Sequence, residues 1–220
     1  MMKLILSLTL IWTLSSTAEA LECWTGQGTD TKQQTLRSCN STQLCATIAT
    51  QENDNGTLTQ NTIRSCVSSS LFSEGKHTFS YSVGLATTIE SVHVCSTDGC
   101  NSEIIPYPAV QKKNNLQCFT CADKTPAVCN KTLRETFCVG VQDRCISRTV
   151  TEKEGKTAHT FGCVSANFCE LASLMVLQPD STSKFLSEPK CCRSSFCNSA
   201  WSVKLNVIPL LFGLITLIVC

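Results

Sequence analysis

The chain has 220 residues, of which 17 are cysteine, a share far above ordinary globular usage, and its formal net charge is +1. A nearly neutral chain without a basic stripe has no electrostatic footprint for nucleic acid, which excludes that class of partner. Cysteine pairing, more than the size of an apolar core, is expected to determine the fold.

The N-terminus has the pattern of a secretory signal peptide. Lys3 precedes an apolar run at 4–14, and the sequence AEA at 18–20 supplies the small residues of a cleavage site. The run is shorter than the roughly 20 residues that cross a bilayer, which argues against a membrane-spanning anchor. We therefore expect residues 1–20 to be removed and the cysteines to pair in an oxidising compartment.

N-glycosylation fits the same compartment. Three N-x-S/T sequons predict glycans at Asn40, Asn55 and Asn130. Glycosylated residues are expected to lie at the surface of the fold.

The first half of the chain predicts a β-hairpin followed by another strand. The runs 46–51 and 57–64 are rich in threonine and isoleucine, and they flank NDNG at 53–56, a turn sequence suited to positive φ. Residues 78–83 alternate apolar with small polar side chains, as a half-buried strand does.

Residues 102–115 contain two prolines, two adjacent lysines and no cysteine, and are predicted to link two domains, 21–101 and 116–198. The second domain has a matching hairpin, with strands at 145–151 and 156–161 on either side of the sequence EKEG.

A helical spacing follows in the second domain. Leu171, Leu174 and Met175 fall on one face of a helix over 170–177. This face could meet a partner, or it could pack on the protein's own sheet, which is the more common use of an apolar face.

The C-terminal region is typical of the signal for a glycosylphosphatidylinositol (GPI) anchor. Small residues at 198–200 precede a polar spacer at 201–206 and an apolar run at 207–220. Asn198 is the preferred attachment residue, because later attachment would put Trp201 where a small side chain is needed. Residues 199–220 are then removed.

The cysteines reveal an internal repeat. Cys220 leaves with the tail, so that 16 cysteines remain, an even number that can pair completely. The repeats share the endings CSTDGCN at 95–101 and CRSSFCN at 192–198.

The first repeat has six cysteines and the second has ten. Loss of one cysteine of a disulfide would leave its partner as a free, reactive thiol. The first repeat is therefore interpreted as lacking two whole disulfides, with Phe72 and Val94 packing in the place of one of them. The missing set favours pairing Cys121 with Cys129 and Cys169 with Cys191, although sequence alone does not fix the connectivity.

The second repeat begins with C-x2-C, contains a cysteine-bounded hairpin and ends in CC-x4-CN. In these features it resembles the three-finger domain of the lymphocyte antigen 6 and urokinase-receptor superfamily. The resemblance covers residues 21–198 and implies a small disulfide-rich all-β fold of two tandem three-finger domains. The layout is similar to gamma-class phospholipase inhibitors of plasma and to urokinase-receptor-like surface proteins.

The resemblance also implies the disulfide pairing. The implied pairs are Cys23–Cys45, Cys39–Cys66 and Cys95–Cys100 in the first repeat, and Cys118–Cys145, Cys121–Cys129, Cys138–Cys163, Cys169–Cys191 and Cys192–Cys197 in the second.

The sequence contains no motif that indicates catalysis. Cys118 and Cys121 form a C-x2-C pair, but a redox site needs a βαβ context and a zinc site needs reduced thiolates, which export opposes. His77, His93 and His159 belong to no HExxH motif, and there is no GxSxG. We expect a non-enzymatic protein without a metal or cofactor.

The expected function is protein recognition by a GPI-anchored receptor, co-receptor or adhesion molecule on the outer leaflet of the plasma membrane, with an extracellular or cell-surface protein as partner. The alternative is a secreted, phospholipase-inhibitor-like binding protein; a surface enzyme using C-x2-C or a metal is least favoured. A glycan on Asn55, at a hairpin tip, would obstruct docking there. The candidate partner surface is therefore placed in the second repeat, at Lys153, Glu154, Lys156, Leu174, Met175 and Leu177.

Overall fold

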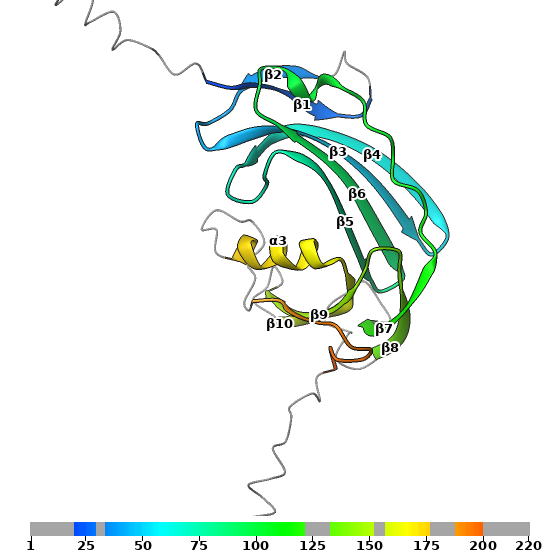
Figure 1. The fold of residues 1–220 in the computed structure, drawn as a ribbon. Helices are drawn as coiled ribbons and strands as arrows, with labels where there is room; N and C mark the ends of the chain where they lie inside the picture. Colours follow the sequence, from blue (N-terminus) through cyan, green and yellow to red (C-terminus); the bar gives the residue numbers. More distant parts are fainter. Residues whose placement is uncertain (1–19, 30–33, 122–132, 152–156, 177–187, 200–220) are drawn as a thin grey trace, which may run out of the picture. The chain divides into compact units, whose positions relative to one another are not determined.

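The computed structural model describes residues 20–29, 34–121, 133–151, 157–176 and 188–199 (Figure 1). Most of these residues form strands, which confirms the predicted β class. The strands are β1 (Glu22–Gln27), β2 (Thr35–Ser38), β3 (Gln43–Asp54), β4 (Thr57–Ser68), β5 (Gly75–Val83), β6 (Ala86–Cys95), β7 (Lys113–Cys121), β8 (Leu133–Val139), β9 (Arg144–Thr151), β10 (Thr157–Val164) and β11 (Lys190–Cys192). The α-helix α3 (Ala166–Val176) and the 3-10 turn η2 (Cys100–Ser102) complete the described elements.

The chain divides into two compact units that do not coincide with the two repeats. One unit comprises Met1–Gln51, Gln60–Thr78 and Glu90–Pro108; the other comprises Glu52–Thr59, Phe79–Ile89 and Ala109–Cys220. Parts of two hairpins of the first repeat therefore belong to the second unit.

The predicted first hairpin is present and longer than expected. It consists of β3 and β4, and its turn places Asn55 and Gly56 at φ 50° and 91°. The amide of Gly56 donates a hydrogen bond to the Asn53 side chain over 2.9 Å. The turn residues therefore supply the positive φ that a tight hairpin needs.

Disulfides form much of the core of each unit. Seven bridges join described cysteines, and they are the pairs that the resemblance implies: Cys23–Cys45, Cys39–Cys66, Cys95–Cys100, Cys118–Cys145, Cys138–Cys163, Cys169–Cys191 and Cys192–Cys197. Cys121 is also disulfide-bonded, and its predicted partner, Cys129, lies outside the described residues. Bridges of this kind stabilise domains whose apolar cores are small.

One disulfide present in the second repeat has no counterpart in the first, as expected. Val94 lies at the position matching Cys191 and is buried, whereas Phe72, which falls opposite Cys169, is half-buried. An apolar side chain thus fills the core at one of the two positions.

Asn101 connects the end of the first repeat to its beginning. Its side-chain oxygen accepts a hydrogen bond from the Trp24 amide (2.9 Å), and its nitrogen donates to the carbonyls of Trp24 (2.9 Å) and Ala46 (3.0 Å). Since Asn101 is fully buried, these contacts replace the hydrogen bonds to water that its side chain loses.

Arg64 stabilises the same region from β4. It is only 1% exposed, and its guanidinium donates to the carbonyl of Asn101 over 2.7 Å and to those of Ser102 and Glu103 over 3.2 and 3.3 Å. Burial lowers the pKa of Arg64. The charge serves to satisfy main-chain carbonyls at the end of η2, where a helical turn leaves them unpaired.

The predicted linker is largely incorporated into the two units. In the first unit Ile105 is buried and the Tyr107 hydroxyl accepts a hydrogen bond from Thr62 over 3.0 Å. In the second, β7 begins at Lys113, inside the predicted linker, and the Asn114 side chain donates to the carbonyls of Gly140 and Gln142. Strand β7 therefore begins three residues before residue 116, the first residue of the predicted second domain.

A candidate binding surface in the second unit

In the second unit, strands β11, β9 and β10 and the second half of β5 lie side by side in the order β11–β9–β10–β5, and β7 pairs with β8 in a separate sheet. Strand β10 pairs with β9 along its whole length, from Thr157 opposite Thr151 to Val164 opposite Arg144. The short strand β11 covers the other edge of β9, with Lys190 opposite Ser147. Side chains that are paired across an antiparallel sheet point to the same face, so this register determines which residues lie together.

Gly162 allows β5 to lie against β10. It pairs with Val83, and a Cβ atom on Gly162 would be 1.9 Å from the main-chain oxygen of Ser82. Such a contact could be relieved only by moving the backbone of β5. Glycine is therefore required here by close approach of two strands.

A buried glutamine fixes the same strand. Gln142 is completely buried, and its amide nitrogen donates to the hydroxyls of Ser80 (3.0 Å) and Ser82 (2.8 Å). Its oxygen accepts a hydrogen bond from the Val139 amide over 2.9 Å. The alternation of small polar residues on β5, which suggested a solvated face, instead supplies partners for this amide.

The predicted helical spacing is confirmed by α3, which begins four residues before the predicted segment. Leu171 is buried and Phe168 stacks on Tyr81 with ring centroids 4.6 Å apart, so the helix packs on its own protein. The disulfide from Cys169 to Cys191 joins it to β11. Leu174, in contrast, is 43% exposed.

The structure therefore describes two of the six residues expected to form the partner surface. Leu174 is exposed and Met175 is half-buried on α3. The other four residues lie outside the described residues: Lys153, Glu154, Lys156 and Leu177.

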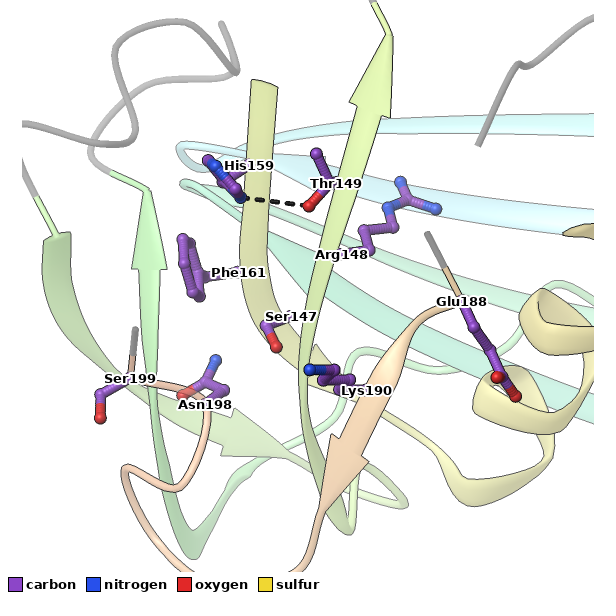
Figure 2. A pocket seen from close by; sticks show the side chains of 9 residues that line it. All are labelled: Ser147, Arg148, Thr149, His159, Phe161, Glu188, Lys190, Asn198 and Ser199. Carbon is purple, nitrogen blue, oxygen red and sulfur yellow. Dashed lines mark hydrogen bonds between the residues drawn. The ribbon is translucent and has the colours of Figure 1, made fainter. Parts of the chain in front are cut away.

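A pocket of about 280 Å³ lies on β9, β10 and β11 and was not expected from the sequence (Figure 2). Its lining residues are Ser147, Arg148, Thr149, His159, Phe161, Glu188, Lys190, Asn198 and Ser199. Alternation along the hairpin could have placed Ser147, Thr149, His159 and Phe161 on one face. Lys190 and Asn198 come from segments that only the tertiary fold brings to this place.

The register explains how the pocket is built. Lys190, Ser147 and Phe161 form one row across the three strands, because Ser147 is opposite both of the others. The next row pairs Thr149 with His159, and the threonine hydroxyl lies 3.2 Å from the imidazole Nδ1. The pocket thus combines an aromatic ring with hydroxyl, imidazole and ammonium groups.

Asn198 forms a fixed part of the pocket wall. It is 3% exposed, accepts a hydrogen bond from the Phe119 amide (3.0 Å), and donates to the carbonyls of Phe119 and Ile146 (2.9 Å each). These contacts repeat those of Asn101 in the first repeat. Because its amide group is satisfied by the main chain, Asn198 acts structurally at this position.

The charged side chains that line the pocket extend in different directions. Figure 2 shows Lys190 beside Ser147, whereas Arg148 and Glu188 extend away from His159 and Phe161. Lys190 is exposed and makes no ion pair with any carboxylate in the described part of the chain. Burial lowers the pKa of Arg148, an effect opposed by the charge of Tyr81.

The cysteines and the other histidines do not form a catalytic arrangement in the described residues. Cys118 and Cys121 are both disulfide-bonded, and Cys118 is joined to Cys145 rather than to its C-x2-C neighbour. Two groups of three sulfurs lie close together, but the sulfurs of each group belong to two adjacent disulfides and offer no thiolate. His77 Nε2 lies 2.8 Å from the Ser73 carbonyl, outside the pocket.

No helix within the described ranges has the length and apolar character needed to cross a membrane.

A family model for the u-PAR/Ly-6 domain matches the chain twice, over residues 19–103 and 114–200, and so accounts for most of its length. Domains of this family are typically non-enzymatic binding domains, and the proteins that contain them are extracellular or on the cell surface. The two matches coincide with the two cysteine repeats, each closed by a buried asparagine. The chain belongs to the u-PAR/Ly-6 domain family and contains two tandem copies of that domain.

Proposed function

We propose that this protein is a GPI-anchored cell-surface protein that binds an extracellular protein through its second domain. The observation that supports the anchor most is the position of Asn198. This residue closes the second domain through three main-chain hydrogen bonds, and it is followed by two small residues, the polar spacer and then the apolar run of an anchor signal. The fold and the lipid would then be separated by almost no stalk.

Attachment at Asn198 is compatible with its structural role. In the reaction the amide bond between Asn198 and Ser199 breaks, residues 199–220 leave with a new amino terminus, and the amine of ethanolamine forms an amide with the Asn198 carbonyl carbon. Only the main-chain carbonyl changes its partner. The side-chain hydrogen bonds of Asn198 to Phe119 and Ile146 are retained.

The recognition surface is proposed to include the exposed side of α3 and the tip of the second hairpin. Leu174 is 43% exposed on a helix whose Leu171 is buried, so one apolar side chain remains available to a partner. Met175 is beside it in the sequence, and Lys153, Glu154, Lys156 and Leu177 would extend the surface. Apolar anchors surrounded by charged residues are a common composition for protein interfaces.

This surface is tested by crosslinking on intact cells, with the purified protein as bait and mass spectrometry to identify the captured protein. Leu174→Asp should lower the yield of that protein about tenfold, the usual scale for an interface anchor. Leu36→Asp is a matched control, because Leu36 in the first domain is also 43% exposed. Equal capture by both variants, with their disulfides intact, would remove α3 from the recognition surface.

A further inference from the structure

The pocket on β9, β10 and β11 lies at the proposed point of lipid attachment. Asn198, the proposed attachment residue, and Ser199, the next residue, both belong to its lining (Figure 2). The amide nitrogen of Ser199 lies 3.3 Å from the Phe196 carbonyl, to which it donates. After attachment, the ethanolamine nitrogen occupies the place of this Ser199 nitrogen, so the anchor begins at the edge of the pocket.

The groups around the pocket suit an anion. Lys190 contributes an ammonium group, and the Ser147 hydroxyl on the same row has no hydrogen-bond partner in the part of the chain that the structure describes. Thr149 and His159 add a hydroxyl and an imidazole on the next row. Arg148 and Glu188 extend away from this row, so Lys190 is the charged group that lies beside Ser147 (Figure 2). Ammonium and hydroxyl groups are ordinary phosphate ligands in proteins.

The covalent structure of the anchor brings a phosphate to this place. Ethanolamine carries a phosphodiester at its other end, and an extended ethanolamine puts the phosphorus roughly 5 Å from its nitrogen at standard bond lengths. A volume of about 280 Å³ is sufficient for a phosphodiester and part of the first sugar. The phosphate is thus presented directly to the pocket.

We infer that the pocket bordered by Asn198 holds the phosphodiester of the anchor's own ethanolamine phosphate, with the Lys190 ammonium as its principal ligand. The inference rests on the proposed GPI attachment. It gives the pocket a covalently delivered ligand. Phe161 is among the lining residues, so an aromatic ring borders the space for the adjoining sugar.

The test uses the full chain on intact cells, labelled with a membrane-impermeant acetylating reagent. The rate of acetylation of Lys190 is compared with that of Lys112, which is also exposed. A second form of the protein, in which a membrane-spanning helix replaces residues 199–220, keeps every other lining residue of the pocket but has no phosphate. Mass spectrometry of the C-terminal peptide establishes whether the natural form carries ethanolamine.

The expected result is a C-terminal ethanolamine and a ratio of Lys190 to Lys112 labelling about fivefold lower in the lipid-anchored form, because two opposite unit charges about 4 Å apart interact on that scale in bulk water, the smallest effect expected for a solvent-exposed ammonium. Absence of ethanolamine would overturn both the attachment and this inference. Ethanolamine together with equal labelling ratios in the two forms would overturn the inference alone, and protection of Lys190 in both forms would do the same.

Discussion

Asn101 and Asn198 show how one side chain can hold the two ends of a domain together. Each accepts from the amide that follows the first cysteine of its repeat, and each donates to the carbonyl after a later cysteine. These hydrogen bonds depend on disulfides, because Cys95–Cys100 and Cys192–Cys197 position the segments that lead to the two asparagines.

Replacing Asn101 should therefore destabilise the first domain strongly. In Asn101→Ala the Trp24 amide and the carbonyls of Trp24 and Ala46 lose buried partners, and we expect the free energy of unfolding to fall by about 2–3 kcal/mol. Urea unfolding followed by tryptophan fluorescence measures the loss. Asn115→Ala, at an exposed position, is the control and should change stability by less than about 0.5 kcal/mol; similar losses in the two variants would contradict this role.

Glu90 gives the domain a pH dependence of defined sign. Burial raises the pKa of Glu90 above 4.5, so the unfolded chain ionises this carboxyl at lower pH than the folded protein does. The protonated Glu90 carboxyl therefore makes its full contribution to the free energy of unfolding when the pH is below the pKa of the unfolded chain. This contribution is lost as the pH rises through the pKa of the folded protein. Glu90→Gln should thus be more stable than wild type at pH 7 and gain nothing at about pH 3.5, below the unfolded pKa, as measured by urea unfolding at both values. An equal gain at both would show that ionisation is not the cause.

The sequence alone could identify which residues matter in several places, but not what they contact. The C-N endings made Asn101 and Asn198 visible as equivalent, whereas their burial depends on strands that are distant in sequence. Arg64 gave no signal, since a lone arginine in a threonine-rich strand is normally solvated. Its carbonyl partners arise only when η2 is brought against β4.

At the scale of elements, Gly162 decides whether β5 can lie beside β10. Gly162→Ala would place a methyl group 1.9 Å from the Ser82 carbonyl oxygen, a contact that no rotamer change can relieve. We expect a loss of about 1–3 kcal/mol, as for overpacked sites, and a larger loss for Gly162→Val. The rate of amide hydrogen exchange should then increase most in β5 and β10. Unchanged exchange rates in these two strands would contradict the close approach of their backbones at Gly162.

The disulfide between α3 and β11 should contribute more to stability than the small terminal loop. Cys169–Cys191 closes a separation of 22 residues, whereas Cys95–Cys100 closes one of 5. On chain entropy, paired replacement by alanine should cost about 3 kcal/mol for the first and about 2 kcal/mol for the second. Comparing the two double variants by urea unfolding checks the order, and a smaller loss from the longer loop would contradict it.

Elements with a strong local pattern were predictable. The turn 53–56 and its flanking strands, and the helical spacing around Leu171, were read from the sequence, although each element proved longer. Strands β1, β2, β7 and β8 were not predicted, because their residues are mixed polar and gain order from adjoining disulfides and strands rather than from alternation.

For the whole molecule, the cysteine pattern carried most of the information. It indicated two repeats, and the family matches over 19–103 and 114–200 agree with that layout. The division into compact units could not be predicted, because it depends on β5 pairing with β10 through Gly162 and Gln142. The pocket at Asn198 was missed for a related reason: Lys190 reaches it only through the pairing of β11 with β9.

The proposed attachment to the membrane through lipid is tested most directly by treating intact cells that express the full chain with a phosphatidylinositol-specific phospholipase. We predict that the enzyme moves most of the surface protein into the medium, with the bridges of both domains intact, while the form that carries a membrane-spanning helix in place of residues 199–220 stays on the cells. Retention of the natural form on treated cells, or its accumulation in the medium without treatment, would contradict the account.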